Sequence, residues 1–174
     1  ILSSSQARGQ WGERMVEDIL NCIGLTEGIN FKQQEQAGKD RPDFTFFLPD
    51  KKVINMDVKF PLNHYEKYIE AETDTEKESE KKAFLKDVRN RIKEVSDRSY
   101  IDPEGGTVDY VLLFIPNESI YSFLNQEDGT LIDFSLERKI ILCSPITLYA
   151  VLSLIRQAVS NFAMEQKAGE MQEL

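Results

Sequence analysis

An Asp-Val-Lys triplet at residues 57–59 has the residue types and spacing of a metal-assisted hydrolytic site. Side chains alternate along an extended strand, so Asp57 and Lys59 would share one face while the apolar neighbours face the core. Carboxylate oxygens bind Mg²⁺ or Mn²⁺, and an adjacent lysine can orient a water molecule or stabilise charge on a phosphate. The alternative is an exposed strand face that carries an ordinary Lys–Asp pair.

A second carboxylate, Asp43, is expected to meet Asp57 across a β-hairpin. The sequence Pro49-Asp50-Lys51 favours a tight turn between two strand-like segments. If Leu48 pairs with Lys52 across this turn, the register places Asp43 opposite Asp57. Like charges in directly opposite positions destabilise a sheet, and a divalent cation bound between the two carboxylates would remove that penalty.

Glu13 is the candidate for a third acidic ligand. It lies at the margin of the apolar stripe of a helix predicted over residues 9–23, so its carboxylate would be partly buried against the sheet. Gly9 and Gly12 lack side chains and would let this end of the helix approach the sheet closely. An ordinary surface glutamate is the alternative interpretation.

The elements that must position these residues indicate an α/β fold, a mixed β-sheet flanked by helices. Strands are predicted at residues 31–34, 43–48, 52–60, 108–115 and 139–143, and helices at 9–23, 76–96, 119–124 and 145–162. The last helix is apolar around much of its circumference, which predicts that it packs against the sheet.

The length of 174 residues favours a single domain spanning residues 1–174, with a core at about 8–165. The chain begins at Ile1 without an initiator methionine, so we expect a fragment of a longer protein. The net charge of −9 argues against a protein that holds nucleic acid by bulk electrostatics alone. Much of this acidity lies in residues 70–80, where six acids accompany one lysine, and we expect this segment to be solvated.

Basic residues supply candidate contacts to DNA. Four of them fall on one flank of the predicted helix 76–96, and two more precede the carboxylate hairpin. Phosphate binding requires several cations along one edge, whereas isolated basic residues are commonly solvated. The candidates are Lys82, Lys86, Arg89 and Lys93 on the helix, and Lys39 and Arg41 before the hairpin.

Pro42-Asp43 followed by Asp57-Val-Lys59, with Glu13 on a leading helix, resembles the PD-(D/E)xK nuclease signature. More narrowly, several separated motifs resemble the RmuC family of DNA recombination proteins. These motifs are Arg8-Gly-Gln-Trp-Gly-Glu13, Arg41-Pro-Asp43, Asp57-Val-Lys59 with Leu62, Tyr65 and Tyr68, Phe114-Ile-Pro116, and Ser144-Pro145. Family members often carry serine where Val58 stands, a side chain that is expected to face the core.

The resemblance implies a restriction-endonuclease-like core that cleaves DNA with Mg²⁺ or Mn²⁺ and limits rearrangement at inverted repeats. Glu13, Asp43 and Asp57 would hold the metal, and Lys59 would position the attacking water or stabilise the transition state. The resemblance also implies a cytoplasmic domain without membrane contact of its own. A membrane anchor at the inner membrane and a coiled coil that forms homo-oligomers would lie elsewhere in the full-length chain. The alternative is a non-catalytic DNA-binding or scaffold module that retains the nuclease fold.

Overall fold

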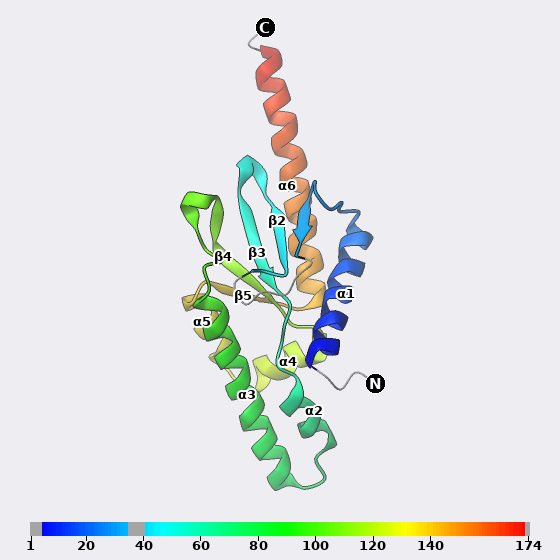
Figure 1. Ribbon diagram of the computed structural model, residues 1–174, viewed down its shortest axis with the longest axis vertical. Helices are drawn as coiled ribbons and strands as arrows, with labels where there is room; N and C mark the ends of the chain where they lie inside the picture. Colours follow the sequence, from blue (N-terminus) through cyan, green and yellow to red (C-terminus); the bar gives the residue numbers. More distant parts are fainter. Residues whose placement is uncertain (1–4, 35–40, 173–174) are drawn as a thin grey trace.

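The computed structural model describes the backbone of residues 5–34 and 41–172, and the side chains from residue 9 onward within these ranges (Figure 1). Its central feature is a five-stranded sheet in the order β1-β2-β3-β4-β5. The strands are β1 (Phe31–Gln33), β2 (Phe44–Phe47), β3 (Val53–Asp57), β4 (Thr107–Phe114) and β5 (Ile140–Cys143). β1, β2 and β3 pair antiparallel, whereas β3, β4 and β5 pair parallel. The predicted mixed sheet is therefore confirmed.

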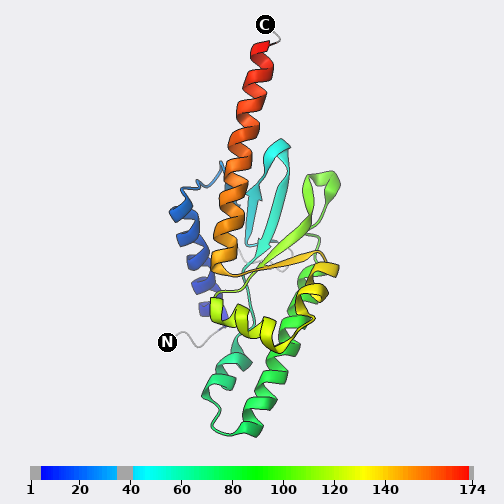
Figure 2. The same cartoon turned by 180° about the vertical axis from the view of Figure 1, so that it is seen from behind.

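Helices cover both faces of this sheet (Figures 1 and 2). One face carries α1 and α6, and the other carries α3, α4 and α5. The helices are α1 (Ser5–Ile23), α2 (Asn63–Glu70), α3 (Asp74–Ser96), α4 (Glu118–Glu127), α5 (Leu131–Glu137) and α6 (Pro145–Gln172). The short helices α2 and α5 were not predicted. At eight residues, α2 is shorter than the window of about 11–18 residues over which helical periodicity is recognised.

The hairpin between β2 and β3 has the predicted register. The Leu48 amide donates to the Lys52 carbonyl oxygen at 2.8 Å, and Phe44 lies opposite Met56. Asp50 turns the chain with a positive φ of 59°, within a short 3₁₀ turn at Pro49–Lys51. Both strands are shorter than predicted, because β2 begins after Asp43 and β3 ends at residue 57.

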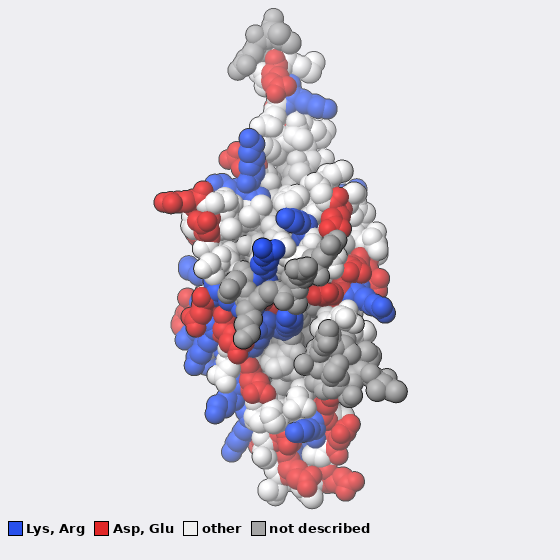
Figure 3. Space-filling view, in the orientation of Figure 1, with Lys and Arg blue, Asp and Glu red and all other residues white. Residues whose placement is uncertain are grey.

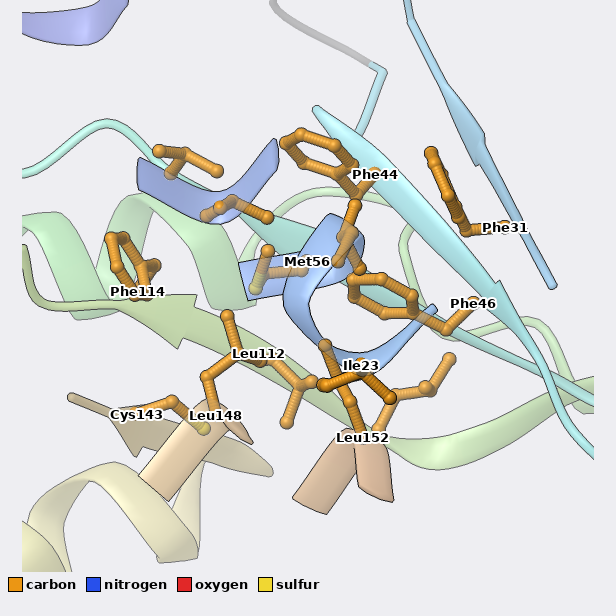
Figure 4. Close-up of a cluster of buried hydrophobic side chains, with 14 residues drawn as sticks. Ile23, Phe31, Phe44, Phe46, Met56, Leu112, Phe114, Cys143, Leu148 and Leu152 are labelled. Carbon is orange, nitrogen blue, oxygen red and sulfur yellow. The ribbon is translucent and has the colours of Figure 1, made fainter. Parts of the chain in front are cut away.

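The core consists of two apolar clusters, one on each face of the sheet. Figure 4 shows the first, in which Phe44 and Met56 of the hairpin meet Leu148 and Leu152 of α6. The second gathers the buried side of α3, including Phe84, against β4 and β5. Because both faces are covered, β3 is buried on its two sides.

α6 packs against the sheet as predicted, through Leu148 and Leu152, but much of its apolar surface stays exposed. Only Leu148 and Leu152 are buried among its described residues, while Ile146 and Leu154 are 70% and 71% exposed. The helix runs to Gln172, and its second half projects beyond the rest of the domain (Figure 1). By length and composition alone α6 could cross a membrane, a weak signal that core helices of soluble proteins also give. The apolar surface of α6 therefore extends beyond the side that packs on α1 and the sheet.

Candidate active site

An open cleft of about 850 Å³ lies where α1, the end of β3 and α3 come together. Glu13, Asp43 and Lys59, from three separate segments, all line it. The lining also includes polar residues of α3, namely Asp87, Asn90, Arg91 and Glu94. The fold thus brings three of the four predicted catalytic residues into one cleft.

Gly12 allows α1 to reach this position. A Cβ atom at Gly12 would lie 2.9 Å from Cγ1 of Val58, closer than ordinary contact permits. The predicted role of Gly12 in close approach is therefore confirmed. Gly9 does not have this role, because no described atom lies within 4 Å of a Cβ atom placed at Gly9. Burial next to β3, followed by repulsion from Glu17, raises the pKa of Glu13, and nearby Lys59 opposes this rise.

Asp43 is a buried carboxyl with one strong hydrogen bond. It is 7% exposed, and its Oδ2 atom accepts from the Val58 amide at 2.7 Å. Burial, followed by repulsion from Asp57, raises the pKa of Asp43 to about 7. The predicted juxtaposition of Asp43 and Asp57 is therefore present, and its consequence is a carboxyl that retains a proton toward neutral pH.

Asp57 is 1% exposed and has a different environment from Asp43. Its Oδ1 atom accepts from Arg91 Nη2 at 2.6 Å, and its Oδ2 atom accepts from Arg98 Nη1 at 2.7 Å. The Tyr100 hydroxyl donates to the same Oδ2 atom at 3.2 Å. These three partners could not be predicted from the sequence, because they lie on α3 and beyond it without a motif spacing to Asp57. Two guanidinium groups thus balance the negative charge of Asp57, a role that the sequence interpretation gave to a metal ion.

Comparison with known proteins identifies the relatives of this chain. The model of the RmuC family matches residues 1–174. The chain belongs to the RmuC family. It is 35% identical over 94% of its length to a DNA recombination protein RmuC homolog of Vibrio cholerae, and covers 33% of that protein. It is 34% identical over 87% of its length to the DNA recombination protein RmuC of Escherichia coli, again covering 33% of the relative.

The RmuC-family chain described here therefore spans about a third of the length of these curated relatives. A homolog from Pseudomonas aeruginosa is 30% identical over 99% of the chain, which covers 39% of that protein. No solved structure matches. Family membership rests on these sequence matches, and the α/β architecture rests on the structure of the chain.

The acidic residues of this RmuC-family domain suit a divalent cation only in part. Glu13 and Asp43 present oxygen ligands to one cleft, and Mg²⁺ is commonly held by one or two carboxylates with water and substrate phosphate. Among the described residues, no group of three or more acids, histidines or cysteines is arranged to hold a metal. Each Asp57 oxygen already accepts from a guanidinium group. The three-carboxylate site stays a prediction, and the geometry favours Glu13 and Asp43 within it.

None of the predicted DNA-contact residues that the structure describes lines the cleft. α3 presents three sides: a buried side, a cleft side, and a flank with the predicted basic residues. On that flank Arg89 donates to both oxygens of Asp128, at 2.8 and 2.7 Å, and Lys93 lies over the Phe134 ring. Lys82, Lys86 and Arg41 are exposed and do not line the cleft, while Lys39 lies outside the described residues.

The acidic segment 70–80 occupies the far end of the α2–α3 hairpin, at the bottom of Figure 3. All of its residues are described, and none of them lines the cleft. Its charge is therefore separated from the candidate site.

Proposed function

We propose that this domain is a metal-dependent deoxyribonuclease with a restriction-endonuclease-like core, acting in DNA recombination. The observation that carries the proposal is the convergence of Glu13, Asp43 and Lys59 on one cleft beside Asp57. The recombination role is supported by the names of the relatives, which are DNA recombination proteins of the RmuC family. A limit on rearrangement at inverted repeats is the corresponding cellular proposal.

Glu13 and Asp43 are the residues that would hold Mg²⁺ or Mn²⁺, because their oxygens face the same cleft. The bound cation would supply Lewis acidity toward a phosphate oxygen. The hydrogen bond from Val58 holds the Asp43 carboxyl in place. Lys59 is exposed within the cleft, where its ammonium group can orient a water molecule or stabilise negative charge on the phosphate.

Cleavage of linear, nicked and branched DNA with Mg²⁺ or Mn²⁺ tests the proposal. We expect Glu13→Gln, Asp43→Asn and Lys59→Gln each to lower the rate by about 10²-fold or more, the size of effect seen when one electrostatic group is lost from an active site. Asp18→Asn is the matched control for Glu13, because Asp18 is an exposed carboxylate on the same helix α1 and does not line the cleft. Lys52→Gln is the matched control for Lys59, because Lys52 also does not line the cleft. A parent protein that cuts none of these substrates contradicts the proposal, as do site variants that cut as fast as the parent.

A non-catalytic DNA-binding or scaffold module is the second candidate function. It is favoured by the two arginines that compensate Asp57, and by the lack of a three-ligand group among the described residues. This candidate predicts DNA binding that Asp43→Asn leaves intact, and no cleavage by any variant.

A further inference from the structure

Arg91 is a cleft residue that the nuclease proposal does not use. It lies on α3, and its guanidinium group makes three contacts with described residues. Nη2 donates to Asp57 Oδ1 at 2.6 Å, Nε donates to the Lys59 carbonyl oxygen at 2.9 Å, and Nη1 donates to Glu94 Oε2 at 3.2 Å. Arg91 is thereby fixed at the end of β3, beside Asp57 and the backbone of the catalytic candidate Lys59.

A guanidinium group has five N–H donors, and the three contacts with described residues engage only three of them. The contact with Glu94 is also easily exchanged, because that side chain is 62% exposed and surface ion pairs contribute little stability. Since Arg91 lines the cleft, the remaining donors can meet an anion there. The planar fork of arginine matches two oxygens of a phosphate.

Charge bears on how an anion could bind at this place. Arg91 and Arg98 together oppose the single charge of Asp57, and the exposed Glu94 side chain supplies the second negative charge. A ligand phosphate that displaces Glu94 from Arg91 would take over this charge balance. Arg98 is held by the Tyr100 hydroxyl as well and does not line the cleft, so Arg91 is the member of this group that faces a ligand in the cleft. Fixing the arginine in advance lowers the entropy lost on binding.

We propose that Arg91 binds a phosphate of DNA in the cleft, and that Asp57 is the positioning residue that orients Arg91. The identity of the ligand as DNA rests on the proposed function. In this assignment Asp57 contributes to the site through an arginine instead of through a metal ion.

The experiment measures binding of a fluorescent 30-base-pair duplex by anisotropy, with Ca²⁺ in place of Mg²⁺ and in parallel with EDTA. We expect Arg91→Gln to weaken binding about tenfold and to lower the salt dependence of the affinity by about one phosphate contact. Arg138→Gln is the control for loss of one positive charge, since Arg138 lies at the end of α5 and does not line the cleft. An Arg91→Gln variant that binds like the parent overturns the inference, as does a parent protein without measurable DNA affinity.

Arg89→Gln separates the cleft from the basic flank of α3. Arg89 is two residues from Arg91 but pairs with Asp128 on the other side of the helix. If Arg89→Gln weakens binding as much as Arg91→Gln, the inference is overturned. Arg91→Lys keeps the positive charge but lacks the planar guanidinium group. We expect its DNA affinity to lie between that of the Arg91→Gln variant and that of the parent.

A double-mutant cycle tests the positioning role of Asp57. Asp57→Asn should weaken DNA binding in the parent and have little further effect in the Arg91→Gln background. Equal losses in both backgrounds would show a purely structural role and overturn the assignment. If thermal melting shows that Asp57→Asn does not fold, Arg91→Lys and Arg91→Gln still decide whether Arg91 binds DNA.

Cleavage by the same variants in Mg²⁺ keeps the two proposals distinguishable. DNA binding that depends on Arg91 without cleavage by any protein would support this inference and contradict the nuclease. If the parent protein cleaves DNA and the Arg91→Gln variant binds DNA as tightly as the parent, the nuclease proposal is supported and this inference is contradicted.

Discussion

The two faces of β3 are both buried, but different interactions hold them in place. On one face, Ile54 and Met56 lie in the apolar cluster with α1 and α6. On the other, Asn55 accepts from the Thr45 hydroxyl at 2.6 Å and donates to the Tyr100 carbonyl oxygen at 2.9 Å, and Asp57 is held by two arginines. Apolar burial requires suitable volume, whereas buried polar groups require partners at defined positions. The stability effects of substitutions on the two faces should therefore differ in their cause as well as in their size.

The largest expected effect is that of Asp57→Ala. Removing this carboxylate leaves Arg91 and Arg98 without their buried counter-charge, which typically costs about 3–5 kcal/mol in the free energy of unfolding. Urea denaturation provides the measurement. The control is Asp128→Ala, whose partner Arg89 is less buried and for which we expect about 1 kcal/mol. Similar losses in the two variants would show that burial of the pair does not matter.

Met56 tests the apolar face of the same strand. Met56→Ala should lower the free energy of unfolding by about 2–4 kcal/mol, because the side chain is fully buried and leaves a cavity. Met56→Leu conserves volume and should cost less than about 1.5 kcal/mol. If the conservative leucine variant is as unstable as the alanine variant, the apolar face is as position-specific as the polar one.

Asp43 adds a pH dependence to the comparison, in the metal-free protein. Its pKa is raised to about 7 in the folded state, above the ordinary value of 3.8, so the native protein binds this proton more tightly than the unfolded chain. Its contribution to the unfolding free energy should therefore fall as pH rises from about 4 to about 7. The loss is up to about 4 kcal/mol, since this pKa lies about three units above its ordinary value and one unit corresponds to about 1.4 kcal/mol.

Asp43→Asn removes this titration, so the variant should gain stability relative to the parent across the same pH range. Denaturation at pH 4, 6 and 8 in EDTA measures the difference. A difference that does not change with pH would show that Asp43 titrates normally.

The smallest effect concerns the contact between α1 and the segment after β3. Gly12→Ala places a methyl group against Val58, so the usual helix-propensity gain of about 1 kcal/mol should be lost or reversed. Gly9→Ala is the matched variant on the same helix, with no described atom near the new methyl group, and should stabilise by about 0.5–1 kcal/mol. Thermal melting compares the two. Equal gains would show that α1 can move away from the sheet without loss.

Local patterns predicted much of the fold. The turn at Pro49–Lys51 and the alternation of the flanking strands were enough to obtain the register that pairs Phe44 with Met56. The helix predicted at 76–96 was also found, because Val88, Ile92 and Val95 recur at helical spacing and form its buried side. The helix that begins at Pro145 was correctly predicted to pack on the sheet, but its apolar composition did not reveal how much of its surface other elements leave exposed.

The sequence by itself determined that Asp43 and Asp57 would meet, because a short hairpin with a defined turn sets its own register. The entry of Glu13 into the same cleft also followed, in part, from Gly12 on a helix with a clear apolar stripe. Only the tertiary structure decided how Asp57 is compensated, since Arg91 and Arg98 are separated from it by 34 and 41 residues. Their approach depends on how α3 rotates and packs on the sheet, which is set by the whole core and not by any local pattern.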